Sequence, residues 1–220
     1  TQKLKGKKNG GKGKNKPSAK IKKTQKEMLY GILNERNIRQ IQFGLNKKFS
    51  TWYGSAVYFD PETKRLGCSE TKGQLSSVSN SQYWLDTLFV CEYCFKYTDD
   101  QTRFVGHVAS CPFQYRVPGK IKYKSPEYTI RRVKGSKYQL FCQCLCLFTK
   151  LYLDNKSMYF KVDHYEFYIV YETGSTKPMG FFSKDLVSYQ QNNLACILIF
   201  PPYQRRGLGL LLIEFSYKLS

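Results

Sequence analysis

An apolar run that leads through a basic, glycine-rich turn into a helix is the feature that most constrains the fold of this chain. The run covers residues 193–200 and the helix is predicted over residues 208–219. Apolar residues recur at helical spacing along one face of that helix. They are Leu208, Leu211, Leu212, Phe215 and Leu219. The pattern predicts a buried strand whose end opens directly into a helix packed on its sheet.

The turn between them has the chemistry of a phosphate site. It reads Gln204, Arg205, Arg206, Gly207, Leu208 and Gly209. The first N–H groups of a helix lack intrahelical partners and lie at its positive end, where they favour an anion. Glycines let the main chain approach a bulky diphosphate, and the arginines add charge. The alternative is a tight turn with solvated arginines. The spacing is neither Gly-x-x-x-x-Gly-Lys-Ser/Thr nor Gly-x-Gly-x-x-Gly, which indicates coenzyme A over a nucleotide.

Four other residues have metal-ligand spacing. Cys91, Cys94, His107 and Cys111 read C-x2-C-x12-H-x3-C, which suits a knuckle followed by a short helix. These side chains can fill all four tetrahedral positions of a zinc ion, so we expect a structural site within a module at residues 89–114. The alternative is four unrelated buried residues, although one of only two histidines falls where a ligand is needed.

The remaining cysteines favour a different role. Cys142, Cys144 and Cys146 lie in an apolar segment predicted to be a helix over residues 141–153, where small core residues are favoured over a second metal site. Cys68 lies in a polar loop and is interpreted as incidental. With eight cysteines, metal-type spacing and no signal peptide, the thiols belong in a reducing compartment.

The first residues form a separate basic segment. The formal charge of the chain is +20, and eleven lysines fall between Lys3 and Lys26 with no acidic residue before Glu27. Such a tract cannot bury enough apolar surface to fold, so we predict a disordered tail over residues 1–37. Nuclear import and non-specific nucleic-acid contact are its expected uses, and a merely solvated tail is the alternative. No run of about twenty apolar residues exists, so no membrane span is expected.

The rest of the chain predicts an α+β (mixed α/β) fold. We expect strands, in chain order, at residues 41–44, 52–59, 128–133, 165–171, 179–183 and 193–200. The fourth and fifth should form a hairpin that leads into the last. We expect a mixed sheet covered by helices, with the cofactor cleft near the end of a central strand.

These motifs together resemble the MYST family of histone acetyltransferases. The similarity covers about residues 38–220, and residues 193–220 resemble the acetyl-coenzyme A signature of that family. Further blocks match in the same order at residues 141–143, 150–154, Lys156 and 180–184. The silencing-associated (something-about-silencing) member is the most similar within the family. The resemblance implies a GNAT-like acetyltransferase core, incomplete at its C-terminus, with a Cys-Cys-His-Cys finger and an acetyl-coenzyme A binding core over residues 140–220.

The resemblance also implies roles for individual residues. The backbone at Cys196, Ile197 and Leu198 would polarise the acetyl carbonyl, and the turn from Gln204 to Gly209 would bind the pyrophosphate. Cys196 matches a cysteine proposed to carry the acetyl group, but we favour direct attack by the substrate lysine in a ternary complex, with Cys196 shaping the site. Lys156 matches a buried, autoacetylated lysine, against the alternative of an exposed lysine in a turn. Asn155 stands where that family pattern has His, and Cys144 where it has Asn.

The ends of the chain suggest a fragment. The sequence begins at Thr1 without methionine and stops at Ser220, at the end of the cofactor helix. By the resemblance, the glutamate that acts as general base lies beyond Ser220, so the isolated chain is expected to be inactive. Glu214 falls within the helix pattern and is interpreted as structural or solvated.

The resemblance implies a function in chromatin. It is the transfer of acetyl from acetyl-coenzyme A to a histone-tail lysine, in silencing or transcription regulation in the nucleus. Histone tails, nucleosomes and subunits of a multiprotein complex are the implied partners. The alternative is a non-catalytic zinc-finger protein that binds chromatin or DNA, and a small-molecule acetyltransferase is a weaker one. The turn at Gln204 discriminates, because a pure binding module does not need it.

Overall fold

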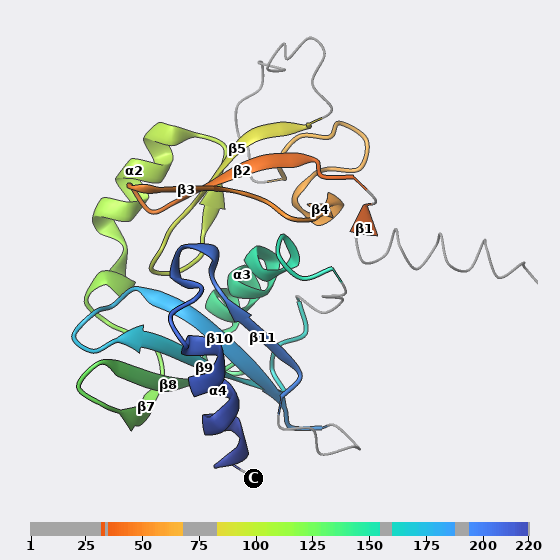
Figure 1. The fold of residues 1–220 in the computed structure, drawn as a ribbon. Coiled ribbons are helices and arrows are strands. Elements are labelled where there is room, and N and C mark those ends of the chain that lie inside the picture. The colour runs from red at the N-terminus through yellow and green to blue at the C-terminus, as the bar shows by residue number, and fades with distance from the viewer. Residues whose placement is uncertain (1–31, 34, 68–82, 155–159, 188–193, 220) are drawn as a thin grey trace, which may run out of the picture.

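A four-stranded sheet and a five-stranded sheet, with a helix between them, form the centre of the described part of the chain, and a two-stranded pair lies beside them (Figure 1). The computed structural model describes residues 32–33, 35–67, 83–154, 160–187 and 194–219. Cys68, Lys156 and most of the predicted basic tail lie outside these residues. The short strand β1 (Ile32–Leu33) pairs with β4 (Gly54–Ser55), so the folded part begins before Ile38.

The upper sheet carries the zinc-type module. Its strand order is β3 (Lys47–Ser50), β2 (Ile38–Phe43), β5 (Leu85–Val90), β6 (Tyr97–Thr98). β2 and β5 are parallel, and the other pairs are antiparallel. The strand predicted at residues 41–44 is confirmed as β2, which starts earlier and ends before Gly44, whose φ is 61°. Helix α2 (Gln101–Ser110) and the 3₁₀ turn η2 (Pro112–Gln114) complete the module.

The strand predicted over residues 52–59 is wrong. Only β4 forms a strand there, and a 3₁₀ turn, η1 (Ala56–Tyr58), follows it before Phe59 makes an isolated bridge with Leu66. The N–H groups of Trp52 and Tyr53 both donate to the Leu151 carbonyl, at 3.0 and 3.1 Å, which ties the segment to the end of a helix. Aromatic residues here serve packing rather than strand pairing, since β-propensity depends on context.

The lower sheet has five strands and is antiparallel throughout. Its order is β11 (Cys196–Ile199), β10 (Pro178–Asp185), β9 (Tyr165–Glu172), β8 (Tyr128–Lys134), β7 (Lys120–Lys124). The hairpin of β9 and β10 is confirmed. The expected mixed sheet is wrong for this layer, and β11 lies at its edge among the described strands instead of at its centre. Strand direction depends on long-range pairing that local patterns do not encode.

Helices α3 (Gln139–Lys150) and α4 (Leu208–Tyr217) cover opposite faces of the lower sheet. The core between the two sheets includes Cys142, Cys144 and Cys146 on α3, which confirms them as buried residues. Burial raises the pKa of the Cys142 thiol, which keeps it neutral. On the other face, Leu208 and Leu212 of α4 are buried, as the helical spacing predicts. None of the described helices is long and apolar enough to cross a membrane.

Candidate functional site

The four predicted metal ligands come together at the start of the zinc-type module. Cys91 follows β5, Cys94 lies in the next turn, His107 is on α2 and Cys111 ends that helix. Their ligand atoms all lie within 4.8 Å of one another, and Cys94 Sγ is 3.2 Å from His107 Nε2. Three thiols and one imidazole in a closed, mostly buried cluster are the donor set and geometry of a structural zinc site, so these residues fit the ion.

The knuckle turn is shaped by the backbone. The Phe95 N–H donates to the Cys91 carbonyl at 2.9 Å, and the Cys91 N–H donates to the Lys96 carbonyl at 2.9 Å. Phe95 has a φ of 63°, a left-handed conformation that is uncommon for a bulky residue. The pKa of the Cys91 thiol is lowered to about 5, first because Cys94 hydrogen bonds to it. A thiolate is the form that binds a metal.

The predicted phosphate turn lies between β11 and α4. The short 3₁₀ turn η3 (Pro201–Tyr203) precedes it, and the Gln204 side chain donates to the Ile199 carbonyl at 2.9 Å. This bond fixes the turn to the end of β11. Arg205 has a φ of 62° and, like Arg206, is exposed.

The first turn of α4 has no side-chain cap. Gly207 stands at the N-cap in a left-handed conformation with a φ of 74°, and no side chain there accepts a hydrogen bond from the helix. The Leu211 N–H makes the first helical bond, to the Gly207 carbonyl at 3.1 Å. The N–H groups of Leu208, Gly209 and Leu210 therefore lack an intrahelical acceptor and sit at the positive helix end. This arrangement suits an anion.

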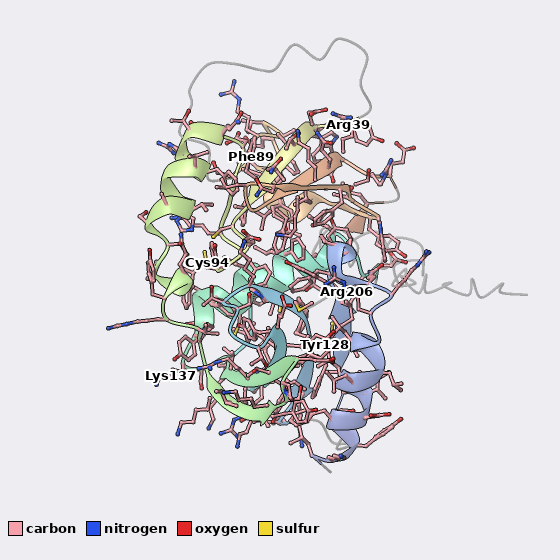
Figure 2. The ribbon with its side chains drawn as sticks, turned by 60° about the vertical axis from the view of Figure 1, so that its left-hand side comes forward. Arg39, Phe89, Cys94, Tyr128, Lys137 and Arg206 are labelled. Carbon is pink, nitrogen blue, oxygen red and sulfur yellow. The ribbon has the colours of Figure 1, made fainter. Side chains whose placement is uncertain are left out.

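Space for a ligand adjoins that helix end. A pocket of about 440 Å³ lies between the β7–β8 turn and the start of α4. Arg206 and Tyr128 both line it, and Figure 2 shows them one above the other on the same side of the molecule. A Cβ at Gly207 or at Gly209 would meet no atom within 4 Å, so the approach to the helix end is open. The turn fits a diphosphate.

Cys196 begins β11, opposite Ser183 of β10, and is half-buried. The Ser183 hydroxyl is buried without a hydrogen-bond partner among the described residues. Tyr165 lies nearby, and its pKa is raised, first by burial and then by Asp185. Cys196 thus packs against the apolar core that includes α3, with the hydroxyl group of Ser183 as a polar neighbour.

The register of β11 separates the three backbone N–H groups assigned to the acetyl carbonyl. The Phe200 N–H donates to the Met179 carbonyl at 3.0 Å, and alternate residues of an antiparallel pair bond to the neighbouring strand. In this register the N–H groups of Cys196 and Leu198 point toward β10, and that of Ile197 points away from it. Among the described strands, Ile197 is therefore the one of the three whose N–H does not face a paired strand.

The structure brings most of the predicted cofactor residues together along β11, η3 and the start of α4. The metal cluster is separate, and Figure 2 shows Cys94 and Arg206 on opposite sides of the view. Lys156 lies outside the described residues. Sequence reasoning missed Glu92, a buried carboxylate between two of the metal ligands. Its position inside the C-x2-C spacing is the signal that could have found it.

Comparison with known proteins finds a family match for the part of the chain that contains the lower sheet. Residues 116–220 match the MOZ/SAS family. The chain is 39% identical over 191 residues to histone acetyltransferase MOF of Drosophila melanogaster, which covers 86% of this chain and 20% of that protein. It is 39% identical over 137 residues to histone acetyltransferase ESA1 of Gibberella zeae, which covers 61% of this chain and 27% of that protein.

A third relative is similar to this chain to nearly the same extent. Over 138 residues the chain is 38% identical to the histone acetyltransferase Tip60 homolog of Caenorhabditis elegans, which covers 62% of this chain and 30% of that protein. The chain spans less than a third of the length of each of these three relatives. The family match begins just before β7 and ends with the residues of α4, so it includes the whole lower sheet and the phosphate turn. Residues 116–220 therefore form a domain that matches the MOZ/SAS family, in agreement with the resemblance of the sequence to the MYST family.

Proposed function

We propose that this chain is the acetyl-coenzyme A binding part of a histone lysine N-acetyltransferase. The uncapped N-terminus of α4, open to solvent at Gly207 and Gly209, is the observation that carries the proposal. All three relatives above are named as histone acetyltransferases. A protein that only binds chromatin has no use for this helix end joined to a strand that carries Cys196.

The turn from Gln204 to Gly209 would bind the pyrophosphate of the cofactor. The N–H groups of the first turn of α4 donate to its oxygens, and Arg205 and Arg206 add positive charge. The five-stranded sheet with α3 and α4 would then be a GNAT-like core, with the pantetheine directed along β11. Ile197, whose N–H points away from β10, is the donor best directed toward the acetyl carbonyl.

The transfer would be direct. The neutral amine of the substrate lysine would attack the thioester carbonyl carbon and form a C–N bond, the C–S bond would break, and the proton that the amine loses would neutralise the departing thiolate of coenzyme A. Cys196 shapes this site beside Ser183 without a covalent intermediate. By family resemblance, Lys156 would be the autoacetylated lysine.

Cys91, Cys94, His107 and Cys111 would hold a structural zinc ion, because the protein fills all four positions and leaves none for water or substrate. When bound, the zinc ion would have only a structural role, which is to hold the knuckle against α2.

The expected partners are histone tails, nucleosomes and subunits of a multiprotein complex in the nucleus. The basic tail would add non-specific contact with nucleic acid. The described residues offer a second basic surface, because the three lysines of β7 are all exposed. We name Lys120, Lys122 and Lys124 the β7 lysines.

The test compares two glycine substitutions. Gly209→Glu places bulk and negative charge where the diphosphate would bind, so the affinity for acetyl-coenzyme A, measured by calorimetry, should fall at least tenfold. Gly106→Glu is the matched control, because Gly106 is also helical and open and lies on α2. Unchanged affinity in a folded Gly209→Glu protein would remove the basis of the proposal. Acetyl transfer to separated histones and nucleosomes by the protein that contains this chain then distinguishes an enzyme from a binding module.

A further inference from the structure

A buried carboxylate lies at the centre of the zinc knuckle. Glu92, between two of the metal-ligand positions, is only 4% exposed. Its two oxygens contact different lysines: Oε2 is 2.8 Å from Lys47 Nζ, and Oε1 is 2.8 Å from Lys177 Nζ. Lys47 begins β3, and Lys177 ends the turn between β9 and β10. One carboxylate of the upper module therefore joins both sheets.

One of these lysines, Lys47, contacts the residue that precedes the phosphate turn. Lys47 Nζ lies 5.8 Å from the centroid of the Tyr203 ring, and Arg206 Cζ lies 5.7 Å from the same ring. Tyr203 is the last residue of η3 and directly precedes Gln204. A continuous set of contacts thus runs from Glu92 through Lys47 and Tyr203 to an arginine of the turn.

An apolar contact supports the other end of the same segment. Phe95, which follows Cys94, packs edge to face on Phe200 with ring centroids 5.5 Å apart, and both rings are fully buried. Phe200 is the last residue before η3. Residues 200–203 therefore rest on the knuckle at both ends, through Phe95 at the start and through Glu92 and Lys47 at Tyr203.

Removal of the carboxylate would change the position of these groups. Each lysine contacts one oxygen of the same carboxylate, so without it two ammonium groups face each other in a partly buried site. Lys177 and Lys47, with side chains 40% and 27% exposed, can both relieve the repulsion by moving toward solvent. Movement of Lys47 takes it away from the ring of Tyr203, where its cation–π contact lies.

We propose that Glu92 is a positioning residue that couples the zinc knuckle to the phosphate turn, so that the knuckle sets the conformation in which residues 203–209 meet an anion. The effect on the cofactor rests on the function proposed above. The effect on the turn itself does not, because it concerns contacts within the chain. Glu92 acts through Lys47 and Tyr203.

The first experiment measures amide hydrogen exchange of residues 203–211 in the chain without cofactor. Glu92→Gln, and separately Lys47→Met, should speed exchange there, while zinc content and exchange in α2 stay as in the wild type. Asp86→Asn is the matched control, since Asp86 lies on β5, the strand before Glu92, and pairs with Arg39, which Figure 2 shows far above Arg206. Unchanged exchange in both variants would overturn the proposal.

The second experiment measures acetyl-coenzyme A binding by calorimetry with the same variants. Affinity should fall about tenfold in Glu92→Gln and Lys47→Met but not in Asp86→Asn, a size typical of coupling between sites. If the wild type binds and the first two variants bind equally well, the coupling is absent. If the wild type does not bind, the proposed function fails, while the exchange experiment still decides whether Glu92 positions the turn.

Discussion

Single residues with unusual backbone angles mark both candidate sites. Phe95 at the knuckle and Arg205 in the turn have positive φ without being glycine, with φ angles of 63° and 62°. Such conformations cost about 1–2 kcal/mol and persist where the surroundings fix them. At Phe95 the cause is packing, because its ring contacts those of Phe43, Phe148 and Phe200. At Arg205 the neighbouring Gln204 bond to β11 holds the chain.

Phe95→Ala should therefore destabilise the protein strongly. Loss of a fully buried aromatic ring costs about 3–5 kcal/mol, and denaturant unfolding monitored by circular dichroism measures it. Tyr115→Ala is the control, because that ring is 82% exposed and its loss should stay within about 0.5 kcal/mol. Equal effects of the two substitutions would show that Phe95 is not a centre of packing.

Elements with a strong local pattern could be predicted from the sequence, and the others could not. The apolar spacing of α4 and the C-x2-C-x12-H-x3-C spacing each lie within one short segment, so both were found. β7 alternates lysines with Ile121 and Tyr123, but all five residues are exposed, so the alternation marks no buried face, and β6 has only two residues. The antiparallel pairing of the strands in the lower sheet and the ion pairs of Glu92 depend on residues that are far apart in the sequence.

The zinc module gives a prediction at the scale of an element. Removal of the ion with a chelator, or Cys91→Ala, should lower the thermal midpoint and release helix α2, because His107 and the cap at Cys111 then lose their anchor. Metal analysis and circular dichroism check this. Cys142→Ala is the comparison, since that thiol is outside the cluster and should leave the zinc content unchanged.

The charge of the whole molecule is distributed between the tail and the folded part. The segment from Arg116 to Lys137 contains eight basic residues and one acidic residue, Glu127. Arg131 is satisfied by three backbone carbonyls and Arg132 pairs with Glu166, but the β7 lysines have no carboxylate partner within the described part of the chain. Lysines on an edge strand also discourage pairing between molecules.

Replacement of all three β7 lysines by glutamine should weaken nucleosome or duplex DNA binding and flatten its dependence on salt. Each lost phosphate contact reduces the slope of log affinity against log salt by about 0.9, so the change should approach about 2.7. Replacement of the same three lysines by arginine is the control, and this variant should bind like the wild type. An unchanged slope in the glutamine variant would assign nucleic-acid contact to the tail alone.

The packing of α3 between the two sheets bears on how much folded protein a cell contains. The core around α3 includes residues of both sheets and of the knuckle, so the two halves share one apolar interior. A shared interior favours a single cooperative unfolding transition. A shortage of zinc would then reduce the number of folded molecules, and the survivors would work at their normal rate. In a cell, metal availability would thus act on the abundance of this protein, through the proteases that remove unfolded chains.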